Sequence, residues 1–385
     1  MDIVATSLPG DDTLDRVASL VPWMQRCAAQ ADVAATFPTE EIAALREAGA
    51  LSLPLPVERD CSGSDEHMVA VDRLVDVLVQ IGLGNLAVGR IVEAHVNARH
   101  LIARYGTARQ KDAAAADVRD GSLFALWVTD PPDDGLRMEA TPQGIRLTGR
   151  KMFCSSAGHA TRVLVTARNE RGKSQMLVVA LGAGERVAPL GSPLQGMRAA
   201  VTGAVDFTGC VVGRDACLGK PGDYLREPDF SAGAWRGSAI ALGGLCALLD
   251  LAKAQLEAGG RLDNPYQLHR IGHVMIACET SRLWVRQVAR IAEDPRADPA
   301  RAVAYTGLAR IAVEAACLDA MRLLQRSLGL AAFRHGNPVE RICRDLGTYL
   351  RQPAPDEVLA EAAVHFARQP GSAQRGSAKP APVWS

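Results

Sequence analysis

Two short stretches of the chain place an aromatic residue two positions before a small hydroxyl. Trp127 precedes Thr129, and Phe153 precedes Ser155. An aromatic face can stack on a flat, redox-active ring, and a hydroxyl can hydrogen-bond to the edge of that ring. These two pairs are therefore the first candidates for a cofactor site, and the elements within 123–156 must hold them near each other.

Both pairs fall at the start of a region with the short runs and turn residues that are typical of β structure. Helical periodicity precedes this region and returns after residue 225. The pattern predicts an α+β fold, mostly α, with an antiparallel β-barrel or sheet domain between two helical domains. Strands are expected at 124–128, 144–147, 163–167, 176–180 and 201–207.

The expected domain order is helices, β domain, helices. We expect an N-terminal helical domain at 1–117, a middle β domain at 118–222, a C-terminal four-helix bundle at 223–368 and a flexible tail at 369–385. Clefts between domains often hold ligands, so a site is expected where the domains meet. The bundle helices are expected at 232–258, 265–293, 303–333 and 356–368.

The composition excludes several classes of partner. Basic and acidic residues balance at 43 each, which argues against nucleic acid or an anionic membrane as the main partner. Neither a signal peptide nor an apolar run of about 18 residues is expected. The nine cysteines are scattered without a Cys-x-x-Cys spacing, so we expect no metal site, reduced thiols and a cytoplasmic protein.

A glycine-rich segment at 82–89, Gly-Leu-Gly-Asn-Leu-Ala-Val-Gly, superficially resembles a dinucleotide-binding loop. It lacks the Gly-x-Gly-x-x-Gly spacing and lies between helical patterns rather than after a strand. We therefore interpret it as a turn between two helices.

Four local motifs follow one another through the chain. They are Tyr-Gly-Thr-Ala-Arg-Gln-Lys at 105–111, Trp-Val-Thr-Asp-Pro at 127–131, Leu-Thr-Gly-Arg-Lys-Met-Phe-Cys-Ser-Ser at 147–156 and Asn-Pro-Val-Glu-Arg-Ile-Cys-Arg-Asp at 337–345. With the domain order, this series resembles the acyl-CoA dehydrogenase superfamily over nearly the whole chain except the tail.

The resemblance implies FAD bound between the β domain and the bundle, and FMN is not excluded. Trp127, Val128 and Thr129 would hold the flavin edge, and the Phe153-Cys154-Ser155 segment would lie against the ring. The family usually has Trp where this chain has Phe153. The family also binds the adenine half of FAD with a second subunit, which implies a homodimer or homotetramer. Residues that match those motifs in part are Arg261, Gln325 and Gly329.

The catalytic base of the dehydrogenases has no clear counterpart. In the family a glutamate follows the Arg-Asp motif, and counting forward from Asp345 leads to Pro353. The nearest carboxylates are Asp356 and Glu357, which also suit the start of a helix. His95 is the other candidate, because flavin monooxygenases of this fold use polar residues, including a histidine, to stabilise oxygenated flavin.

The sequence therefore leaves three hypotheses. The first is an FAD-dependent dehydrogenase that desaturates an acyl-CoA or other small acyl substrate with a displaced base such as Asp356. The second is a two-component flavin monooxygenase, and the third is a non-catalytic flavin- or acyl-binding relative. The first implies an electron acceptor as partner, and the second implies a flavin reductase. Arg236 could meet an anionic group or form a structural ion pair.

Overall fold

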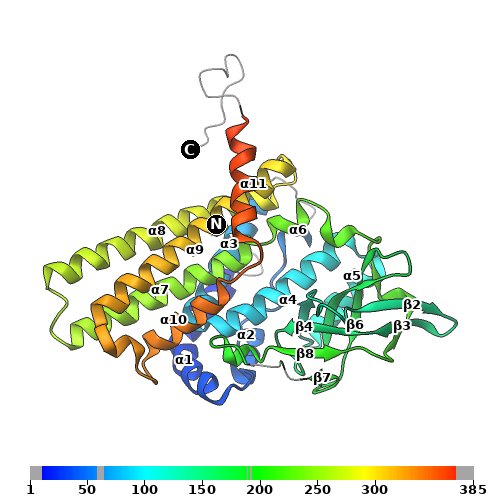
Figure 1. Ribbon diagram of the computed structural model, residues 1–385, viewed down its shortest axis with the longest axis horizontal. Helices are drawn as coiled ribbons and strands as arrows, with labels where there is room; N and C mark the ends of the chain where they lie inside the picture. The colour runs from blue at the N-terminus through cyan, green and yellow to red at the C-terminus, as the bar shows by residue number, and fades with distance from the viewer. Residues whose placement is uncertain (1–10, 59–64, 189, 191–192, 370–385) are drawn as a thin grey trace, which may run out of the picture.

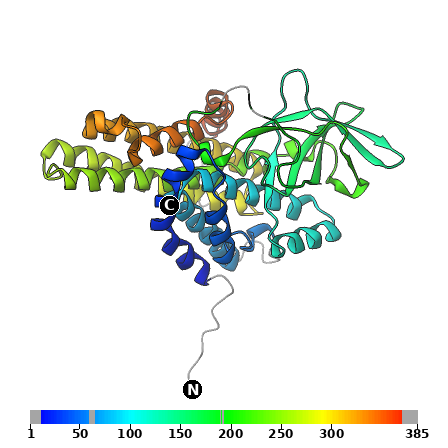
Figure 2. The same ribbon diagram turned by 90° about the horizontal axis from the view of Figure 1, so that it is seen from below.

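The computed structural model describes residues 11–58, 65–188, 190 and 193–369. In this part of the chain the helical bundle and the β domain lie at opposite ends of the molecule, with α3 and α4 between them (Figure 1, Figure 2). The expected tail lies outside the described residues from position 370 onward.

Helices make up the N-terminal third of the chain. The helix α5 is closed at its start by a reciprocal capping box between Thr107 and Gln110, both in the motif at 105–111. The elements are α1 (Asp11–Ala34), α2 (Thr39–Glu47), η1 (Pro56–Glu58), α3 (Asp65–Gly84), α4 (Leu86–Tyr105) and α5 (Ala108–Arg119).

The glycine-rich segment is a turn between helices, as expected. Asn85 separates α3 from α4, and its side chain accepts a hydrogen bond from the backbone N–H of Ala87. The glycines serve helix packing. A Cβ atom on Gly82 would lie 2.3 Å from the carbonyl oxygen of Ile240 in α7 (Trp235–Ala258), and one on Gly243 would lie 2.2 Å from that of Val79. The backbones of α3 and α7 therefore touch.

The middle of the chain forms two sheets. The larger has seven strands, in the order β10-β6-β5-β2-β3-β9 with β1 paired to β5, and the smaller has the order β4-β8-β7. Most pairs are antiparallel, but β1 runs parallel to β5. The strands are β1 (Phe124–Trp127), β2 (Arg137–Thr141), β3 (Gly144–Thr148), β4 (Arg150–Cys154), β5 (Arg162–Arg168), β6 (Ser174–Ala180), β7 (Val187–Ala188), β8 (Gly203–Asp206), β9 (Val211–Val212) and β10 (Cys217–Leu218).

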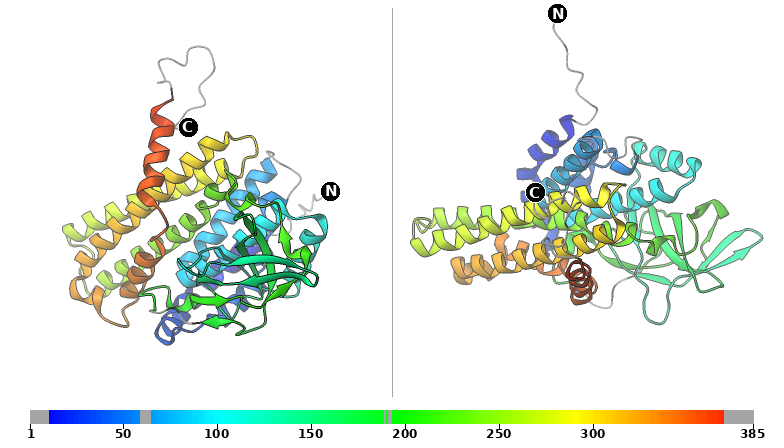
Figure 3. Two further views of the ribbon diagram at one scale, coloured as in Figure 1. Left: turned by 45° about the vertical axis from the view of Figure 1, so that its right-hand side comes forward. Right: turned by 90° about the horizontal axis from the view of Figure 1, so that it is seen from above.

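The C-terminal region contains one helix that the sequence pattern did not predict, between the helices expected at 303–333 and 356–368. The motif at 337–345 opens α10 (Pro338–Tyr349), which is capped by Asn337 and packs on α7. The last helix, α11 (Pro355–Ala367), packs on α9 and stands out from the body of the molecule (Figure 1, Figure 3). The remaining elements are η2 (Arg198–Ala200), η3 (Arg214–Ala216), η4 (Asp223–Leu225), α6 (Asp229–Ala232), α8 (Pro265–Glu293), α9 (Pro299–Leu328) and η5 (Gly329–Phe333).

The stretch Asp229–Ala258 is more apolar than the sequence analysis predicted. By length and composition alone it could cross a membrane, although the sequence pattern predicted no such run. Its most apolar window is 67% buried inside the protein. Trp235, Ile240 and Leu248 on α7 are completely or almost completely buried. This stretch therefore has the character of the core helix of the bundle.

Candidate functional site

A cavity of about 950 Å³ opens where the β domain meets α10. Thr129, Phe153 and Ser155 line its β-domain side. We call it the β-domain cavity. Three of the six residues at 127–129 and 153–155 that were expected to contact a cofactor thus face one space.

A β-bulge exposes Phe153 to this cavity. The register between β4 and β8 shifts between Lys151 and Cys154, and Phe153 has a left-handed backbone with φ of 53°. Its side chain is 50% exposed, whereas the side chains of Lys151 and Cys154 are fully buried. Bulges commonly redirect a side chain beside a functional site, and a bulky residue in this conformation is unusual. The geometry therefore presents an aromatic ring to the cavity.

Trp127 has a structural role rather than a contact in the cavity. Its side chain is 2% exposed in the β-domain core, and Nε1 donates to the carbonyl oxygen of Ser155 at 2.8 Å. Val128 and Cys154 do not line the cavity either. The side chains of Trp127 and Cys154 are buried in the β-domain core, so contact of these three residues with a cofactor, through backbone or side chain, stays a prediction.

The buried Lys151 holds Thr129 in position. Its Nζ donates to the carbonyl oxygen of Val128 at 3.1 Å and to Oδ1 of Asp130 at 2.6 Å. The backbone N–H of Met152 also donates to the carbonyl oxygen of Thr129 at 2.9 Å. Burial lowers the pKa of Lys151, and the bond to Asp130 opposes that shift. These contacts fix the end of β1 against β4, so the hydroxyls of Thr129 and Ser155 share one wall.

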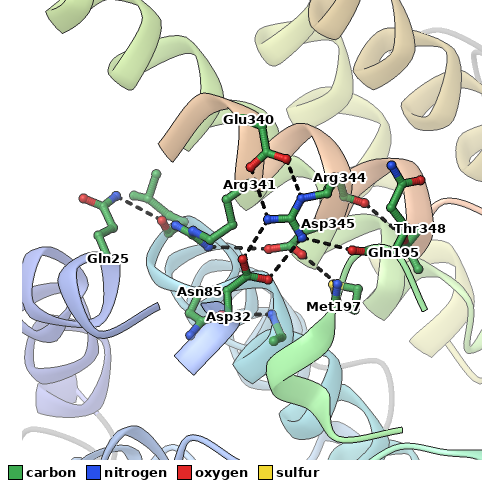
Figure 4. A network of polar contacts seen from close by, with 12 residues as sticks. Gln25, Asp32, Asn85, Gln195, Met197, Glu340, Arg341, Arg344, Asp345 and Thr348 are labelled. Carbon is green, nitrogen blue, oxygen red and sulfur yellow. Dashed lines mark hydrogen bonds and ion pairs between the residues drawn. The ribbon is translucent and has the colours of Figure 1, made fainter. Parts of the chain in front are cut away.

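One face of α10 forms the opposite wall. Most of its cavity-lining residues recur every three or four positions, as one helix face requires, and Tyr349 at the end of the helix lies off that face. This face also holds the segment 193–202 (Figure 4). The cavity-lining residues of α10 are Glu340, Cys343, Arg344, Gly347, Thr348 and Tyr349.

The Arg-Asp pair of the motif at 337–345 anchors that segment through backbone contacts. Arg344 Nη1 donates to the carbonyl oxygen of Gln195, and the Met197 N–H donates to Asp345 Oδ1 at 2.6 Å. Arg344 is itself held by Asp32 at 2.7 Å and by Glu340 at 2.6 Å (Figure 4). Burial raises the pKa of Asp345 to about 6. The network makes the segment a fixed wall of the cavity.

The three residues expected to meet the adenine half of FAD lie around the end of α9. Gln325 lines the β-domain cavity together with Cys343. Arg261 is exposed, and its Nη1 donates to the carbonyl oxygen of Ser327 at 3.5 Å. Gly329 caps α9 with φ of 64°. Neither Arg261 nor Gly329 lines the cavity of this chain.

A second cavity of about 800 Å³ lies among α4, α6, α7, α9 and α11. We call it the bundle cavity. Gln352 and Pro353, in the loop between α10 and α11, line both cavities, and we call these two residues the junction. Counting along the sequence from Asp345 thus leads to a residue that borders both cavities, and neither Gln352 nor Pro353 carries a carboxylate.

One buried acid that borders the same cavity as the junction is Glu93, which sequence reasoning missed. It is 8% exposed and lines the bundle cavity together with Gln352. Its Oε2 accepts from Tyr349 Oη at 2.8 Å and from Arg90 Nη1 at 3.0 Å, and its Oε1 accepts from Asn97 Nδ2 at 3.2 Å. Burial and Glu93 raise the pKa of Tyr349 well above its usual range, so the phenol keeps its proton. The available signal was two charged residues, Arg90 and Glu93, within an apolar helix.

His95 is structural. It is fully buried, its Nε2 contacts the carbonyl oxygen of Leu51 at 2.9 Å, and its Nδ1 accepts from the Phe124 N–H at 3.1 Å. Both ring nitrogens are thus occupied in a neutral imidazole. Burial and Arg99 lower the pKa of His95 to about 3. Since it lines neither cavity, the prediction of a catalytic role does not agree with its position.

Asp356 and Glu357 are exposed in the first turn of α11 and line neither cavity. Their position fits stabilisation of the helix start. Arg236 forms a buried ion pair, with Nη2 at 2.6 Å from Glu293 Oε1. The structure thus supports neither Asp356 as a base nor Arg236 as a free cation for a ligand.

Comparisons with known proteins agree with this architecture. The family model described as acyl-CoA dehydrogenase, N-terminal domain, matches residues 21–122. The chain is 24% identical over 339 residues to the short-chain specific acyl-CoA dehydrogenase of Bos taurus, covering 83% of this chain and 80% of that protein.

Two solved structures show the same fold over most of the chain. The dibenzothiophene monooxygenase TdsC from Paenibacillus sp. A11-2, solved with FMN, gives a TM-score of 0.80 at 20% identity over 93% of this chain and 98% of that one. The butyryl-CoA dehydrogenase from Megasphaera elsdenii gives 0.77 at 16% identity over 96% and 100%. The chain therefore carries a segment at 21–122 that matches the acyl-CoA dehydrogenase N-terminal domain, and it has the acyl-CoA dehydrogenase fold.

Proposed function

We propose that the protein is a flavin-dependent oxidoreductase that binds the flavin ring, as FAD or FMN, in the β-domain cavity. The observation that carries this proposal is the bulge that turns Phe153 into that cavity beside the hydroxyls of Thr129 and Ser155. The volume of about 950 Å³ falls in the range of roughly 300–1,000 Å³ that is usual for cofactor sites. An aromatic face, hydroxyls and a fixed opposite wall are what a flavin site requires.

We further propose that the substrate occupies the bundle cavity. Its walls combine apolar side chains such as Leu101, Leu126 and Val303 with a few polar groups, as is usual for small-molecule sites. The shared junction would place a substrate atom next to the flavin ring. Gln352 is held there by a hydrogen bond from Nε2 to the carbonyl oxygen of Tyr349 at 2.8 Å, so its carboxamide can orient a substrate without removing a proton.

Among the reactions of this fold, oxygenation fits the junction best. A base that removes an α-proton must be a free carboxylate within hydrogen-bond reach of the substrate. Gln352 and Pro353 cannot act in this way. Glu93 accepts three hydrogen bonds, one of them from Arg90. When bound, reduced flavin would supply the two electrons with which molecular oxygen gives one atom to the substrate and leaves the other as water, and a partner reductase would regenerate the reduced flavin.

Desaturation of an acyl thioester is the second candidate, and Glu93 is the observation that favours it. This acid is buried in the wall of the bundle cavity, as an α-proton acceptor would have to be. In this reading Asn97 and Tyr349 position the carboxylate through the hydrogen bonds described above. The similarity to the bovine acyl-CoA dehydrogenase is a further reason to test it.

One experiment separates the two candidates. Purified protein reconstituted with flavin is mixed without oxygen with a panel of acyl-CoA thioesters, and separately reduced and exposed to oxygen. We expect no bleaching of the flavin by any thioester and a rapid, spectrally distinct reaction of the reduced protein with oxygen. Bleaching by a thioester would instead establish desaturation, and failure to bind flavin would refute both candidates.

A further inference from the structure

Two arginines line the bundle cavity, and one of them, Arg310, has no acidic partner among the described residues. Arg310, on α9, lines the bundle cavity and also a small cavity of about 70 Å³ bordered by Glu93, Tyr349 and Gln352. Its Nη2 donates to the carbonyl oxygen of Pro353 at 2.6 Å. Its Nε is buried and has no hydrogen-bond partner among the residues that the structure describes.

The charge of Arg310 is not neutralised within the described part of the chain. No ion pair there includes it, whereas Arg236 in the same cavity pairs with Glu293 at 2.6 Å. The acid one turn further along α9, Glu314, pairs with Arg351 at 2.9 Å. Burial lowers the pKa of Arg310, and Glu314 only partly opposes that shift.

The other acids that line the cavity already have partners or face solvent. Glu93 pairs with Arg90. Asp229 accepts from Tyr105 Oη at 2.6 Å. Glu227 and Glu361 are exposed. Arg310 is therefore the cation of this cavity that a ligand could reach and complement.

A half-buried guanidinium without a counter-ion is unfavourable, and a bound anion would relieve that cost. The planar fork of arginine fits a carboxylate better than any other common group, because two N–H donors can meet two oxygens. The neighbouring walls are apolar, with Leu101, Val303 and Val358 among them. We propose that the substrate is an organic acid whose carboxylate binds Arg310 while its apolar body packs in the bundle cavity.

This proposal rests on the proposed function for the placement of the substrate. Since Arg310 holds Pro353 of the junction, it would keep the carboxylate close to the β-domain cavity. Arg310 would then act as a specificity-determining residue that selects acids over neutral molecules of the same shape.

Two pairs of matched probes test the selection, namely hexanoate with hexanamide and benzoate with benzamide. Binding to the flavin-reconstituted full chain is measured by titration calorimetry and by the change in flavin absorbance. We expect at least one acid to bind about 10- to 100-fold more tightly than its amide. Arg310→Gln, which removes the charge and keeps a polar side chain, should lose this preference and keep the flavin affinity.

The control is Arg322→Gln, which removes an exposed arginine from the same helix and should leave the preference unchanged. Equal affinity for acid and amide, no binding by either acid, or a preference that survives in Arg310→Gln would each overturn the inference. A third outcome separates the two proposals. If the wild-type protein does not bind flavin but still binds an acid more tightly than its amide, and Arg310→Gln does not, the proposed function is refuted and the carboxylate site is supported.

Discussion

At the scale of single residues, the chemistry depends on which side chains face the junction and are free to react. Gln352 and Pro353 are there but cannot act as a base, whereas Glu93 has a carboxylate that accepts hydrogen bonds from Arg90, Asn97 and Tyr349. Type and spacing, together with the family resemblance, drew attention to Phe153 and Ser155, which line the β-domain cavity. The role of Glu93 could not be predicted in this way, because it depends on Tyr349, which is 256 positions away in the sequence.

Glu93→Gln is the substitution that tests the reaction. The amide keeps the size of the side chain and part of its hydrogen bonding, but it cannot serve as a base. We expect oxygenation of the substrate by the variant to stay within about tenfold of wild type, measured by product formation. A fall of about 10²- to 10⁴-fold would identify Glu93 as a general base and favour desaturation. Glu361→Gln, an exposed change in the same cavity wall, is the control.

The buried His95 should make the free energy of unfolding depend on pH in the acid range. Its pKa is about 3 in the folded chain against an ordinary value of 6.5. Between these values the unfolded chain binds the proton and the folded chain does not, so stability falls as the pH drops from about 6.5 toward 3. One such group contributes a slope of about 1.4 kcal/mol per pH unit.

Denaturant unfolding of His95→Gln across that range should show a shallower pH dependence than wild type. His335→Gln, at an exposed position, should match the wild-type slope. Asp345 has a raised pKa of about 6, so its contribution to stability increases as the pH falls from about 6 to 3.8. Asp345 is present in every variant, and its contribution therefore cancels when the pH slopes of the variants are compared. An unchanged slope in His95→Gln would contradict the buried neutral imidazole.

At the scale of elements, the contact between α3 and α7 helps to position α4, which borders both cavities. Gly82 and Gly243 allow these helices to meet backbone to backbone. α4 follows α3 after a single residue, and it carries Arg90 and Glu93. The position of these two side chains therefore depends on a helix crossing that lies outside the cavities.

Gly243→Ala should lower the free energy of unfolding by about 1–3 kcal/mol, because the added methyl group would overlap the backbone of α3. Gly272→Ala in α8 is a matched control, since a Cβ atom there meets nothing within 4 Å. That change should raise stability by about 0.5–1 kcal/mol through helix propensity. Thermal and denaturant unfolding measure both. Equal effects of the two substitutions would show that the crossing is not tight.

Local pattern was enough to predict most of these elements. Alternation and turn residues located β1, β3, β5 and β6, and helical periodicity located α3, α4, α7, α8 and α9. The bulge at Phe153 could not be predicted, because it arises from the pairing of β4 with β8, about 50 positions further along. The helix α10 lay within a recognised motif, but its role as a cavity wall depends on contacts with 193–202.

At the scale of the whole molecule, the outer face of α8 is apolar and exposed. Met275, Ile276 and Leu283 are 55%, 64% and 63% exposed. Leu268, two helical turns before Met275, is 50% exposed. Exposed apolar side chains that gather on one helix face commonly mark an interface, and the exposed Glu279 lies on this face as well. We propose that it contacts a second copy of the chain, in line with the homodimer or homotetramer expected from the resemblance.

Ile276→Glu should shift the protein toward the monomer, because it would bury an unpaired charge in that contact. Light scattering with size-exclusion chromatography measures the mass. Val211→Glu, at a similarly exposed apolar position of the β domain (48%), should leave the mass unchanged. A wild-type monomer, or an oligomer that Ile276→Glu does not disturb, would contradict this assignment.

The central claim is that Phe153 and the β-domain cavity hold a flavin, and titration of FMN and FAD with the purified protein tests it most directly. Quenching of flavin fluorescence reports binding. Phe153→Asp places a carboxylate at the 50% exposed position in the cavity, and Val211→Asp places one at a 48% exposed position outside it. We predict saturable binding to wild type and to Val211→Asp, and binding weakened at least about tenfold in Phe153→Asp. No binding by wild type, or equal affinity in all three proteins, would contradict the account.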